Sequence, residues 1–433
     1  MTSKINGENE QSSQPQQSLF TSLPEDVVVD ILARVPRCDY PTLSLVSKQF
    51  HSLVTSHEIY VRRSLLRCTE KCLYVVILNV NESPNDGLYI LRRKANGNHR
   101  LVYISSLSNW PIAESFLVVG SMIYGFGGMD WEISSRAFSI DCRSHTMQPL
   151  PDMPIPMADT CAGFLDGKIY VFGHCSMISE VIVVFNTKTQ VWEPRVIKAN
   201  TSSPAEAWHF GQMVVMDDKI YTRYLLNGFV YVPKENKWEK DEVLNSKTWE
   251  DGGACVLDEV MYYYDSFGKC LNRYDPKERR WGVVKGLDDL VAEIGFPYWT
   301  NTLRYGRNLA LYFRKREGEE PRPSSIQKIW CAEISLGRRQ GNDIWGEVEW
   351  CDQLHEDQKG QYYHWEEKVF VTLSSKEKKE DFMAMKGCKP SHRPKKRAKL
   401  VQSSLLLVSP GTWLADMCPD RYDVGVKKSS KKV

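Results

Sequence analysis

The side chains that most often carry catalysis are sparse in this sequence. Its 433 residues include nine histidines and twelve cysteines. His174 stands beside Cys175, so an imidazole and a thiolate are adjacent, and this pair is the first place to test for a bound metal. Other histidines of the central part are dispersed, at His145, His209, His355 and His364. The sequence contains no P-loop, no Gly-x-Ser-x-Gly elbow and no His-Glu-x-x-His pair. We therefore expect no catalytic residue, no metal ligand and no cofactor.

A glycine cluster at Gly125, Gly127 and Gly128 resembles part of a dinucleotide loop. Such a loop needs a third glycine at the correct spacing and a helix directly after it. Both are missing here, and the glycines follow the apolar run Ile123-Tyr124. The cluster is typical of the end of a β-strand.

Charge and cysteine usage exclude several classes of protein. Lysine and arginine number 56 against 54 aspartates and glutamates, so we do not expect the body of the chain to bind nucleic acid or a membrane. No apolar stretch approaches the roughly 18 residues of a membrane span, and no signal-peptide pattern opens the chain. The closest two cysteines are Cys68 and Cys72, and no Cys-x-x-Cys pair exists. We expect a soluble, intracellular protein in the nucleus, the cytoplasm or both, with reduced thiols.

Two helical patterns near the N-terminus predict a small docking unit. Ser22 and Glu25 have the spacing of a capping box, which predicts a helix start. An apolar stripe follows at Val27, Val28, Ile31, Leu32 and Val35. A second run, which continues in helical period across Ser47, contains Leu43, Leu45, Val46, Phe50 and Leu53. A unit this small cannot bury all of these side chains in its own core, so some should face a partner.

The middle of the chain repeats a pattern of strands and turns. A turn followed by an apolar strand starts at Gly120, Asp166, Asp217 and Asp258, about 40 to 50 residues apart. Further along each repeat, a long side chain follows a turn at constant spacing, at Met147, Trp192, Trp238 and Trp281. Two hairpins per repeat give four strands, which is typical of a β-propeller blade. Core aromatics of another all-β fold remain the alternative.

The edges of the repeat region predict the number of blades and the closure of the ring. Apolar runs within 73–104 supply strands for a first blade, and runs within 309–350 supply strands for a sixth. We expect six blades, with five as the alternative. Residues 369–373 are the first candidate for the strand that closes the ring, and residues 405–408 are the second.

The N-terminal pattern resembles the F-box, the helical motif that binds the Skp-type adaptor of cullin-RING ubiquitin ligases. The match runs from Leu-Pro through Ile-Leu and Val-Pro to Leu-Val-Ser-Lys-x-Phe, with Phe50 in place of the commoner tryptophan. By this resemblance, the adaptor-binding residues are Leu23, Pro24, Ile31, Leu32, Val35, Pro36, Leu45, Val46 and Phe50. An ordinary amphipathic helical pair that packs on its own protein is the alternative.

The repeats resemble kelch repeats, whose hallmark is an apolar strand ending in two glycines, followed by a tyrosine and a tryptophan. Residues 123–128 fit this pattern fully, and the later copies have lost glycines. The order of motifs is similar to that of plant-type F-box/kelch-repeat proteins. This resemblance implies a mainly β fold, a six-bladed kelch-type propeller preceded by a small α-helical F-box. We expect a disordered tail at 1–18, F-box helices at 19–66, the propeller at 70–375 and a basic, flexible tail at 376–433.

The resemblance also implies a function. The protein would be a non-catalytic substrate-recognition adaptor of a Skp–cullin–F-box ubiquitin ligase complex. Its partners would be the Skp-type adaptor, through it the cullin and the RING subunit, and an unknown target protein that the propeller binds for ubiquitination. Trp131, Trp208, Trp249 and Trp299 lie outside the repeated tryptophan position and are candidate target anchors or core residues. The alternatives are a metal-dependent propeller enzyme and a protein-binding scaffold outside a cullin ligase.

The C-terminal tail changes composition to strongly basic. Between Lys386 and Lys399 it holds seven lysines and arginines and no acid. A candidate nuclear-import signal consists of Pro394, Lys395, Lys396, Arg397 and Lys399. A solvated basic tail and a salt-sensitive attraction to nucleic acid are the other interpretations.

Overall fold

The computed structural model describes most of the chain up to residue 372. The described residues are 23–68, 70, 72–77, 87–93, 97–107, 113–128, 133–176, 179–198, 212–224, 227–249, 253–295, 297, 299–316, 327–339, 343–357 and 367–372. They form two compact units, a helical one that ends at Glu70 and a β one that begins directly after it. The predicted import signal and the expected tails lie outside the described residues.

The helical unit consists of short helices around one apolar core. Its elements are α1 (Glu25–Leu32), the 3-10 helix η2 (Arg37–Asp39), α2 (Tyr40–Ser44), α3 (Lys48–Thr55) and α4 (His57–Leu65). Helix α1 packs on α4 and α2 packs on α3. Val28, Leu32, Phe50, Leu53 and Ile59 are among the side chains at the centre of the core. Val28 and Leu32 of the predicted apolar stripe therefore face inward, whereas Ile31 and Val35 are only partly buried.

Two local predictions about these helices were wrong. Helix α1 begins at Glu25 with Pro24 as its N-cap and no capping side chain, so a capping box headed by Ser22 does not describe this terminus. The carbonyl of Pro24 accepts hydrogen bonds from the amides of Val27 and Val28. The second apolar run is also broken, because Ser47 is extended and its hydroxyl accepts a hydrogen bond of 3.1 Å from the amide of Phe50. Serine favours such caps over helix interiors, so α2 ends and α3 restarts.

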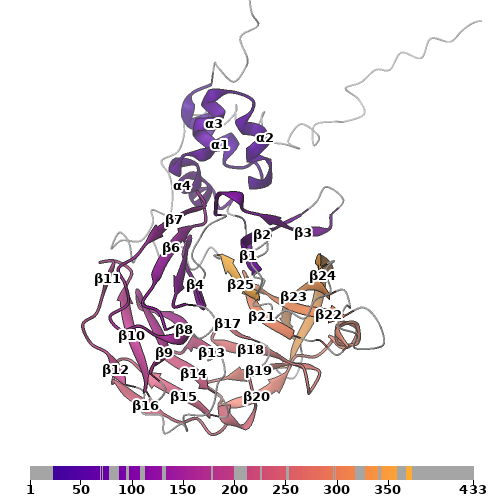
Figure 1. Ribbon diagram of the computed structural model, residues 1–433. Coiled ribbons are helices and arrows are strands. Elements are labelled where there is room, and N and C mark those ends of the chain that lie inside the picture. The colour runs from indigo at the N-terminus through magenta and orange to yellow at the C-terminus, as the bar shows by residue number, and fades with distance from the viewer. Residues whose placement is uncertain are drawn as a thin grey trace, which may run out of the picture. The chain divides into compact units, whose positions relative to one another are not determined.

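The β unit is a six-bladed propeller of antiparallel sheets (Figure 1). Blade 1 contains β25 (Glu367–Thr372), β1 (Cys72–Ile77), β2 (Gly87–Arg93) and β3 (His99–Tyr103). Blade 2 contains β4 (Ser115–Val119), β5 (Met122–Phe126), β6 (Ala137–Asp141) and β7 (Thr146–Pro149). Blade 3 contains β8 (Ala158–Leu165), β9 (Lys168–Ser176), β10 (Ser179–Asn186), β11 (Val191–Trp192) and the short β12 (Ile197–Lys198) beside β10.

The other three blades follow the same order. Blade 4 contains β13 (Gln212–Met216), β14 (Lys219–Tyr224), β15 (Asn227–Val232) and β16 (Lys237–Glu239). Blade 5 contains β17 (Ala254–Leu257), β18 (Val260–Asp265), β19 (Cys270–Asp275) and β20 (Arg280–Val283). Blade 6 contains β21 (Trp299–Tyr305), β22 (Asn308–Arg316), β23 (Gln327–Arg338) and β24 (Ile344–Asp357). Helical turns in the connections are η3 (Ser105–Leu107), η4 (Leu244–Ser246) and α5 (Asp288–Ile294).

The ring closes through β25, the last described strand of the chain. β25 is the innermost strand of blade 1 and pairs with β1 along its whole length, from Cys72 opposite Thr372 to Ile77 opposite Glu367. It also lies beside the innermost strands of blade 2 (β4) and blade 6 (β21). The predicted closure is confirmed for 369–372, whereas Leu373 and residues 405–408 lie outside the described residues.

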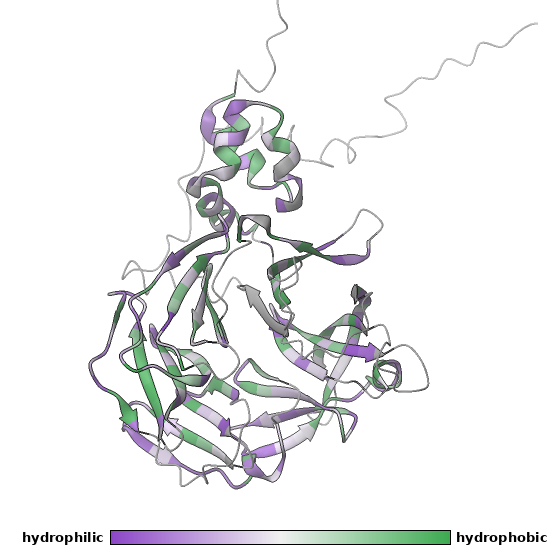
Figure 2. Ribbon diagram, in the orientation of Figure 1, coloured by the Kyte–Doolittle hydropathy of each residue, from purple (hydrophilic) through white to green (hydrophobic). Residues whose placement is uncertain are grey.

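Apolar side chains fill the spaces between neighbouring blades. Six clusters of buried residues occur among the described strands, one between each pair of adjacent blades, including blades 6 and 1. Figure 2 shows the apolar segments along the strands that form these layers. Burial on both faces of a sheet explains why many of these strands are almost continuously apolar.

The repeated tryptophans occupy one structural position. Trp192, Trp238 and Trp281 each lie on the outermost strand of a blade, directly opposite an aromatic residue of the preceding strand. Met147 has the same place in blade 2, opposite Ile140. The constant spacing in the sequence is therefore the length of a hairpin.

The glycine cluster ends a strand, as predicted. A Cβ atom on Gly125 would lie 2.4 Å from the ring of Phe138 on the next strand, so a larger residue would displace that ring. Gly127 follows β5 with a φ of +84°, a conformation that glycine adopts without strain.

Candidate functional site

The helical unit exposes two apolar side chains at the turn between α2 and α3. Leu45 is 85% exposed and Val46 is 63% exposed. Helix α2 ends at Ser44 and Ser47 caps the start of α3, so Leu45 and Val46 lie in the turn between the two helices. Exposed apolar side chains that lie next to one another can mark a protein–protein interaction site. This turn is the strongest candidate for a docking surface in the unit.

A second feature of the same unit is the corner that follows α1. Pro36 is exposed there, and Val35 and Ile31 are partly buried. At the other end of α1, Pro24 is exposed and Leu23 is partly buried.

Two of the predicted adaptor-binding residues belong to the core instead of the surface. Leu32 is 2% exposed and Phe50 is 7% exposed. They pack in the cluster that joins the four α-helices. Their side chains hold the helices that carry the exposed residues.

Polar contacts that we did not predict from the sequence fix the corner after α1. Arg63 is buried, and its Nη1 atom lies 3.1 Å from the carbonyl oxygen of Ala33 and 2.6 Å from that of Val35. The same atom lies 3.0 Å from the hydroxyl of Tyr40. Its Nη2 atom donates to Glu70 at 2.6 Å. A cation at the C-terminus of α1 satisfies carbonyls that have no partner within the helix.

A neighbouring ion pair joins α1 to α4. Asp30 is fully buried, and its Oδ1 atom lies 3.3 Å from Nε of Arg62. Removing a carboxylate from water lowers the stability of the fold by roughly several kcal/mol unless a cation or hydrogen bonds compensate for it. The adjacent arginines of α4 therefore secure both the middle and the end of α1. The charged residues Asp30, Arg62 and Arg63 within apolar helical runs were the available signal, because such residues are seldom buried without partners.

In the propeller, two of the three repeated tryptophans also donate a hydrogen bond to a connection between blades. The indole nitrogen of Trp192 in blade 3 donates to the carbonyl of Pro151, at 2.7 Å. The indole nitrogen of Trp281 in blade 5 donates to the carbonyl of Val243, also at 2.7 Å. Both acceptors lie in the segment that leads from the preceding blade into the tryptophan's own blade. Trp192 and Trp281 thus each hold the connection that leads into their own blade.

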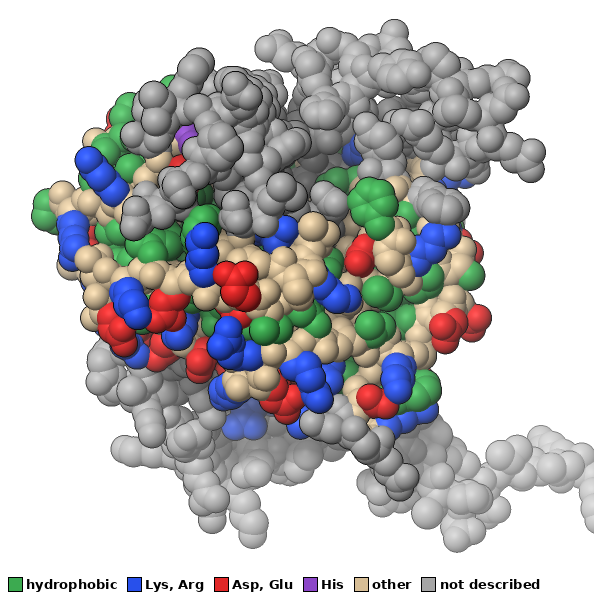
Figure 3. Space-filling view, turned by 90° about the horizontal axis from the view of Figure 1, so that it is seen from below, with side chains coloured by type: hydrophobic (Ala, Val, Ile, Leu, Met, Phe, Trp, Pro, Cys, Tyr) green, Lys and Arg blue, Asp and Glu red, His purple; other side chains and the backbone are tan. Residues whose placement is uncertain are grey.

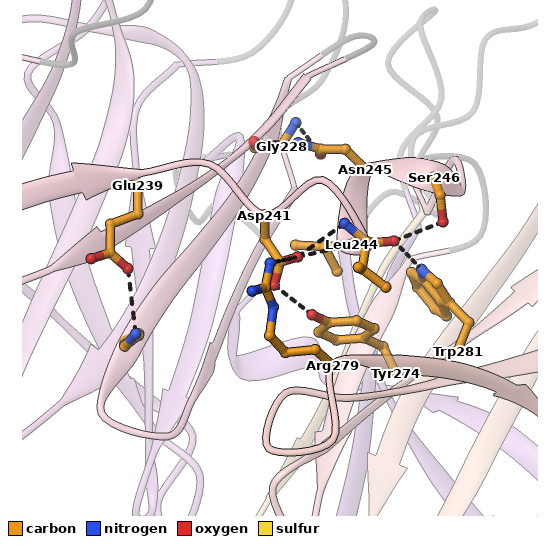
Figure 4. A network of polar contacts seen from close by, with 11 residues as sticks. Gly228, Glu239, Asp241, Leu244, Asn245, Ser246, Tyr274, Arg279 and Trp281 are labelled. Atoms are coloured by element: carbon orange, nitrogen blue, oxygen red, sulfur yellow. Dashed lines mark hydrogen bonds and ion pairs between the residues drawn. The ribbon is translucent and has the colours of Figure 1, made fainter.

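Figure 4 shows the polar network at the seam between blades 4 and 5. Asp241 accepts hydrogen bonds from the hydroxyl of Tyr274, from Nη2 of Arg279 at 3.2 Å and from the amide of Leu244 at 3.2 Å. Partial burial alone would raise the pKa of Asp241, but these bonds and the charge of Arg279 outweigh it and lower the pKa below its ordinary value. The network ties two residues of blade 5, Tyr274 and Arg279, to the connection that leads into this blade.

The candidate target anchors have different environments. Trp249 is fully buried between blades 4 and 5, which makes it a core residue. Trp299 is partly buried at the start of β21, and Trp131 and Trp208 lie outside the described residues. Sequence reasoning missed Phe267, which is 87% exposed at the hairpin between β18 and β19.

The described histidines are not part of a candidate metal site. Within the described part of the chain, no three histidine, cysteine, aspartate or glutamate side chains are placed to hold a metal ion. His174 and Cys175 are partly buried neighbours on β9. The ring nitrogen Nε2 of His145 lies 3.1 Å from the hydroxyl of Tyr74, which is a packing contact between blades 1 and 2. Among the described helices, none is long and apolar enough to cross a membrane.

Basic and acidic side chains alternate on the propeller surface seen in Figure 3, with apolar side chains between them. No field of one sign covers the part of this face that the structure describes.

Comparisons with known families agree with this architecture. The model of the F-box domain matches residues 20–62. The model of the FKB95, Kelch-repeats domain matches residues 88–355, which is more than half of the chain. The chain belongs to the F-box/kelch-repeat proteins. One such protein of Arabidopsis thaliana is 43% identical over 351 residues, covering 77% of this chain and 90% of its own. Another from the same plant is 40% identical over 343 residues, covering 77% of this chain and 87% of its own.

This F-box/kelch-repeat protein also matches a third family model. The family is described as a protein of unknown function (DUF1639), and the match covers residues 373–422. It begins immediately after β25, which ends at Thr372. The basic residues of the candidate import signal, 394–399, fall within this match.

Proposed function

We propose that this F-box/kelch-repeat protein is a substrate-recognition adaptor of a Skp–cullin–F-box ubiquitin ligase complex. The observation that carries the proposal is an F-box whose α2–α3 turn exposes Leu45 and Val46, on the same chain as a closed propeller. The F-box docks on a Skp-type adaptor, which links it to the cullin and the RING subunit. The propeller binds the target protein.

The burial of the F-box residues divides the nine predicted adaptor-binding positions into two groups. Leu45, Val46, Pro24 and Pro36 are exposed, and Leu23, Ile31 and Val35 are partly buried. These seven residues form the adaptor-facing surface in our proposal. Leu32 and Phe50 support that surface from the core.

The chain contributes proximity and no bond-making step. Holding the target near a ubiquitin-loaded enzyme raises the effective concentration of a target lysine, which accelerates transfer without a catalytic group on this chain. Target selection is a property of the loops between strands, because a rigid propeller presents them at fixed positions. Phe267 is an exposed aromatic residue in one of these loops, between β18 and β19, so it is our first candidate for a target contact.

The test is recovery of adaptor and cullin with the tagged full chain and a Leu45→Ala/Val46→Ala variant. Burying these two side chains against a partner contributes about 3 kcal/mol, which corresponds to about 100-fold in affinity. The matched control is Val191→Ala/Val283→Ala, two exposed valines of the propeller. Loss of cullin with the first variant and retention with the control supports the proposal. Equal recovery of cullin with both variants contradicts it.

The same experiment distinguishes the alternatives. Adaptor recovered without cullin indicates a scaffold outside a cullin ligase. A metal-dependent propeller enzyme predicts bound metal in the purified protein, measurable by elemental analysis.

The basic segment carries a separate proposal about localisation. Pro394, Lys395, Lys396, Arg397 and Lys399 present consecutive cations to an import receptor, and the protein then acts in the nucleus as well as the cytoplasm. A fluorescent fusion in which the four basic residues are changed to alanine should move from the nucleus to the cytoplasm. Unchanged distribution contradicts the import role.

A further inference from the structure

The corner that follows α1 is held from both sides of Pro36. On one side, the carbonyl oxygen of Val35 accepts a hydrogen bond of 2.6 Å from Nη1 of Arg63. On the other side, the amide of Arg37 donates a hydrogen bond of 2.9 Å to Oε1 of Glu70. The two holding side chains are bonded to each other at 2.6 Å. One ion pair therefore brackets the exposed proline.

The arginine of this pair is also held by contacts that do not involve Glu70. Arg63 is buried and its guanidinium contacts the carbonyl of Ala33 and the hydroxyl of Tyr40. Tyr40 in turn donates to the carbonyl of Leu32 at 3.1 Å. A planar guanidinium with several partners in fixed directions has little freedom left to lose when a further partner binds. Arg63 is thus a rigid anchor for Glu70.

Glu70 comes from outside the helices. It follows α4, which ends at Leu65, and it precedes β1, which begins at Cys72. Its contacts are 33 residues away in the sequence for Arg37 and seven residues away for Arg63. The segment between the F-box helices and the first propeller strand therefore ends in a bond to the corner.

We propose that Arg63 and Glu70 are positioning residues for adaptor binding, because they hold the Val35–Pro36 corner in the shape that the adaptor meets. The inference rests on the proposed function and deepens it. It makes the F-box of this chain larger than its helices, since the corner is complete only with Glu70. A chain cut between Leu65 and Glu70 keeps the helices α1 to α4 of the F-box but presents a loosened corner.

The experiment measures adaptor affinity for the full chain with Glu70→Ala, and with Glu58→Ala as the matched control. Glu58 is an exposed glutamate in the first turn of α4. Removing a hydrogen-bond partner of a charged group should weaken adaptor binding about tenfold. Glu70→Gln should restore most of the affinity, because its amide oxygen can still accept both bonds. The control should bind as the wild type does.

A double-mutant cycle separates positioning from general destabilisation. Glu70→Ala combined with Pro36→Ala should be less than additive, because both changes act on the corner. Glu70→Ala combined with Leu45→Ala should be additive, because the α2–α3 turn has no bond to Glu70. Thermal unfolding and circular dichroism check that each variant is folded. If Glu70 only stabilised the fold, Glu70→Ala would lower the melting temperature. Its coupling energy with Pro36→Ala would then equal its coupling energy with Leu45→Ala.

The outcomes distinguish this inference from the proposed function. A folded wild type that does not bind the adaptor overturns both. A wild type that binds, with Glu70→Ala as tight as Glu58→Ala, overturns the positioning role alone. Equal coupling of Glu70→Ala to Pro36→Ala and to Leu45→Ala also overturns it.

Discussion

The imidazole Nδ1 of His99 lies 2.8 Å from Oδ2 of Asp352, across the seam where the last blade meets the first. The backbone amide of His99 donates to the same oxygen at 2.9 Å. The ring of His99 also stacks on Trp350, with centroids 3.9 Å apart. His99 begins β3 and Asp352 lies in β24, the outermost strands of blades 1 and 6. The ring of blades is thus closed near its axis by β25 and at its outer edge by the contact between His99 and Asp352.

Removing the carboxylate of Asp352 should loosen this seam. Asp352→Ala deletes the acceptor of two hydrogen bonds and should lower the free energy of unfolding by about 1–3 kcal/mol, because the amide of His99 loses its partner. Urea unfolding measures the change. Asp343→Ala, which removes the exposed ion pair with Lys285, is the control and should cost less than about 1 kcal/mol. Equal effects would contradict a special role for the seam.

Truncation should show that β25 belongs to the propeller. A chain that stops at Thr372 keeps β25, whereas one that stops at Asp357 leaves the inner edge of β1 unpaired. We expect the propeller of the first to unfold in one cooperative transition, and that of the second to lose cooperativity and to aggregate, since an open strand edge recruits other chains. Differential scanning calorimetry and light scattering measure both. A cooperative, monomeric chain ending at Asp357 would contradict closure by β25.

The network around Asp241 should make the seam between blades 4 and 5 sensitive to acid. Its pKa is lower in the folded protein than in the unfolded chain, so the carboxylate adds stability above the ordinary value of about 4. That stability is lost as the pH falls from about 4 through the lowered pKa of the folded state. The difference in unfolding free energy between the wild type and Asp241→Asn should be constant near neutral pH and shrink below about pH 4. A difference that grows in acid would contradict the assignment.

Replacement by alanine should destabilise the protein strongly at one aromatic residue and hardly at all at another. Trp249→Ala removes a fully buried indole and should lower the free energy of unfolding by about 3–5 kcal/mol. Phe267→Ala removes an exposed ring and should change it by less than about 0.5 kcal/mol. Guanidinium unfolding measures both. A large effect at Phe267 would indicate that the ring packs on the protein and would remove it as a target contact.

The propeller was predictable because its spacing is a consequence of hairpin geometry. A tryptophan opposite Phe185, Tyr231 or Tyr274 must follow it at a fixed distance when the turn length is constant. The pairing of the two strands can therefore be predicted from the spacing of the aromatic residues, even in repeats that have lost their glycines. Closure by the segment around Val369 was predictable for a similar reason, since a ring needs one further strand.

The F-box surface was only partly predictable. Helical periodicity identifies an apolar stripe, but it does not say which members are covered by other helices, so Leu32 and Phe50 could not be separated from Leu45. The break at Ser47 overrode the period because a local side-chain cap competes with the helix. The contact of Glu70 with Arg37 joins residues distant in sequence, and no local pattern encodes it.

The pairing of β25 with β1 also sets an order of events during synthesis. The F-box is complete once Glu70 has left the ribosome, but the ring cannot close until Thr372 has followed, about 300 residues later. At roughly 5–20 residues per second, that interval lasts about 15 to 60 s. During it the nascent chain already displays Leu45 and Val46 while its propeller is still an open row of blades. The helical unit is therefore synthesised well before the propeller can close.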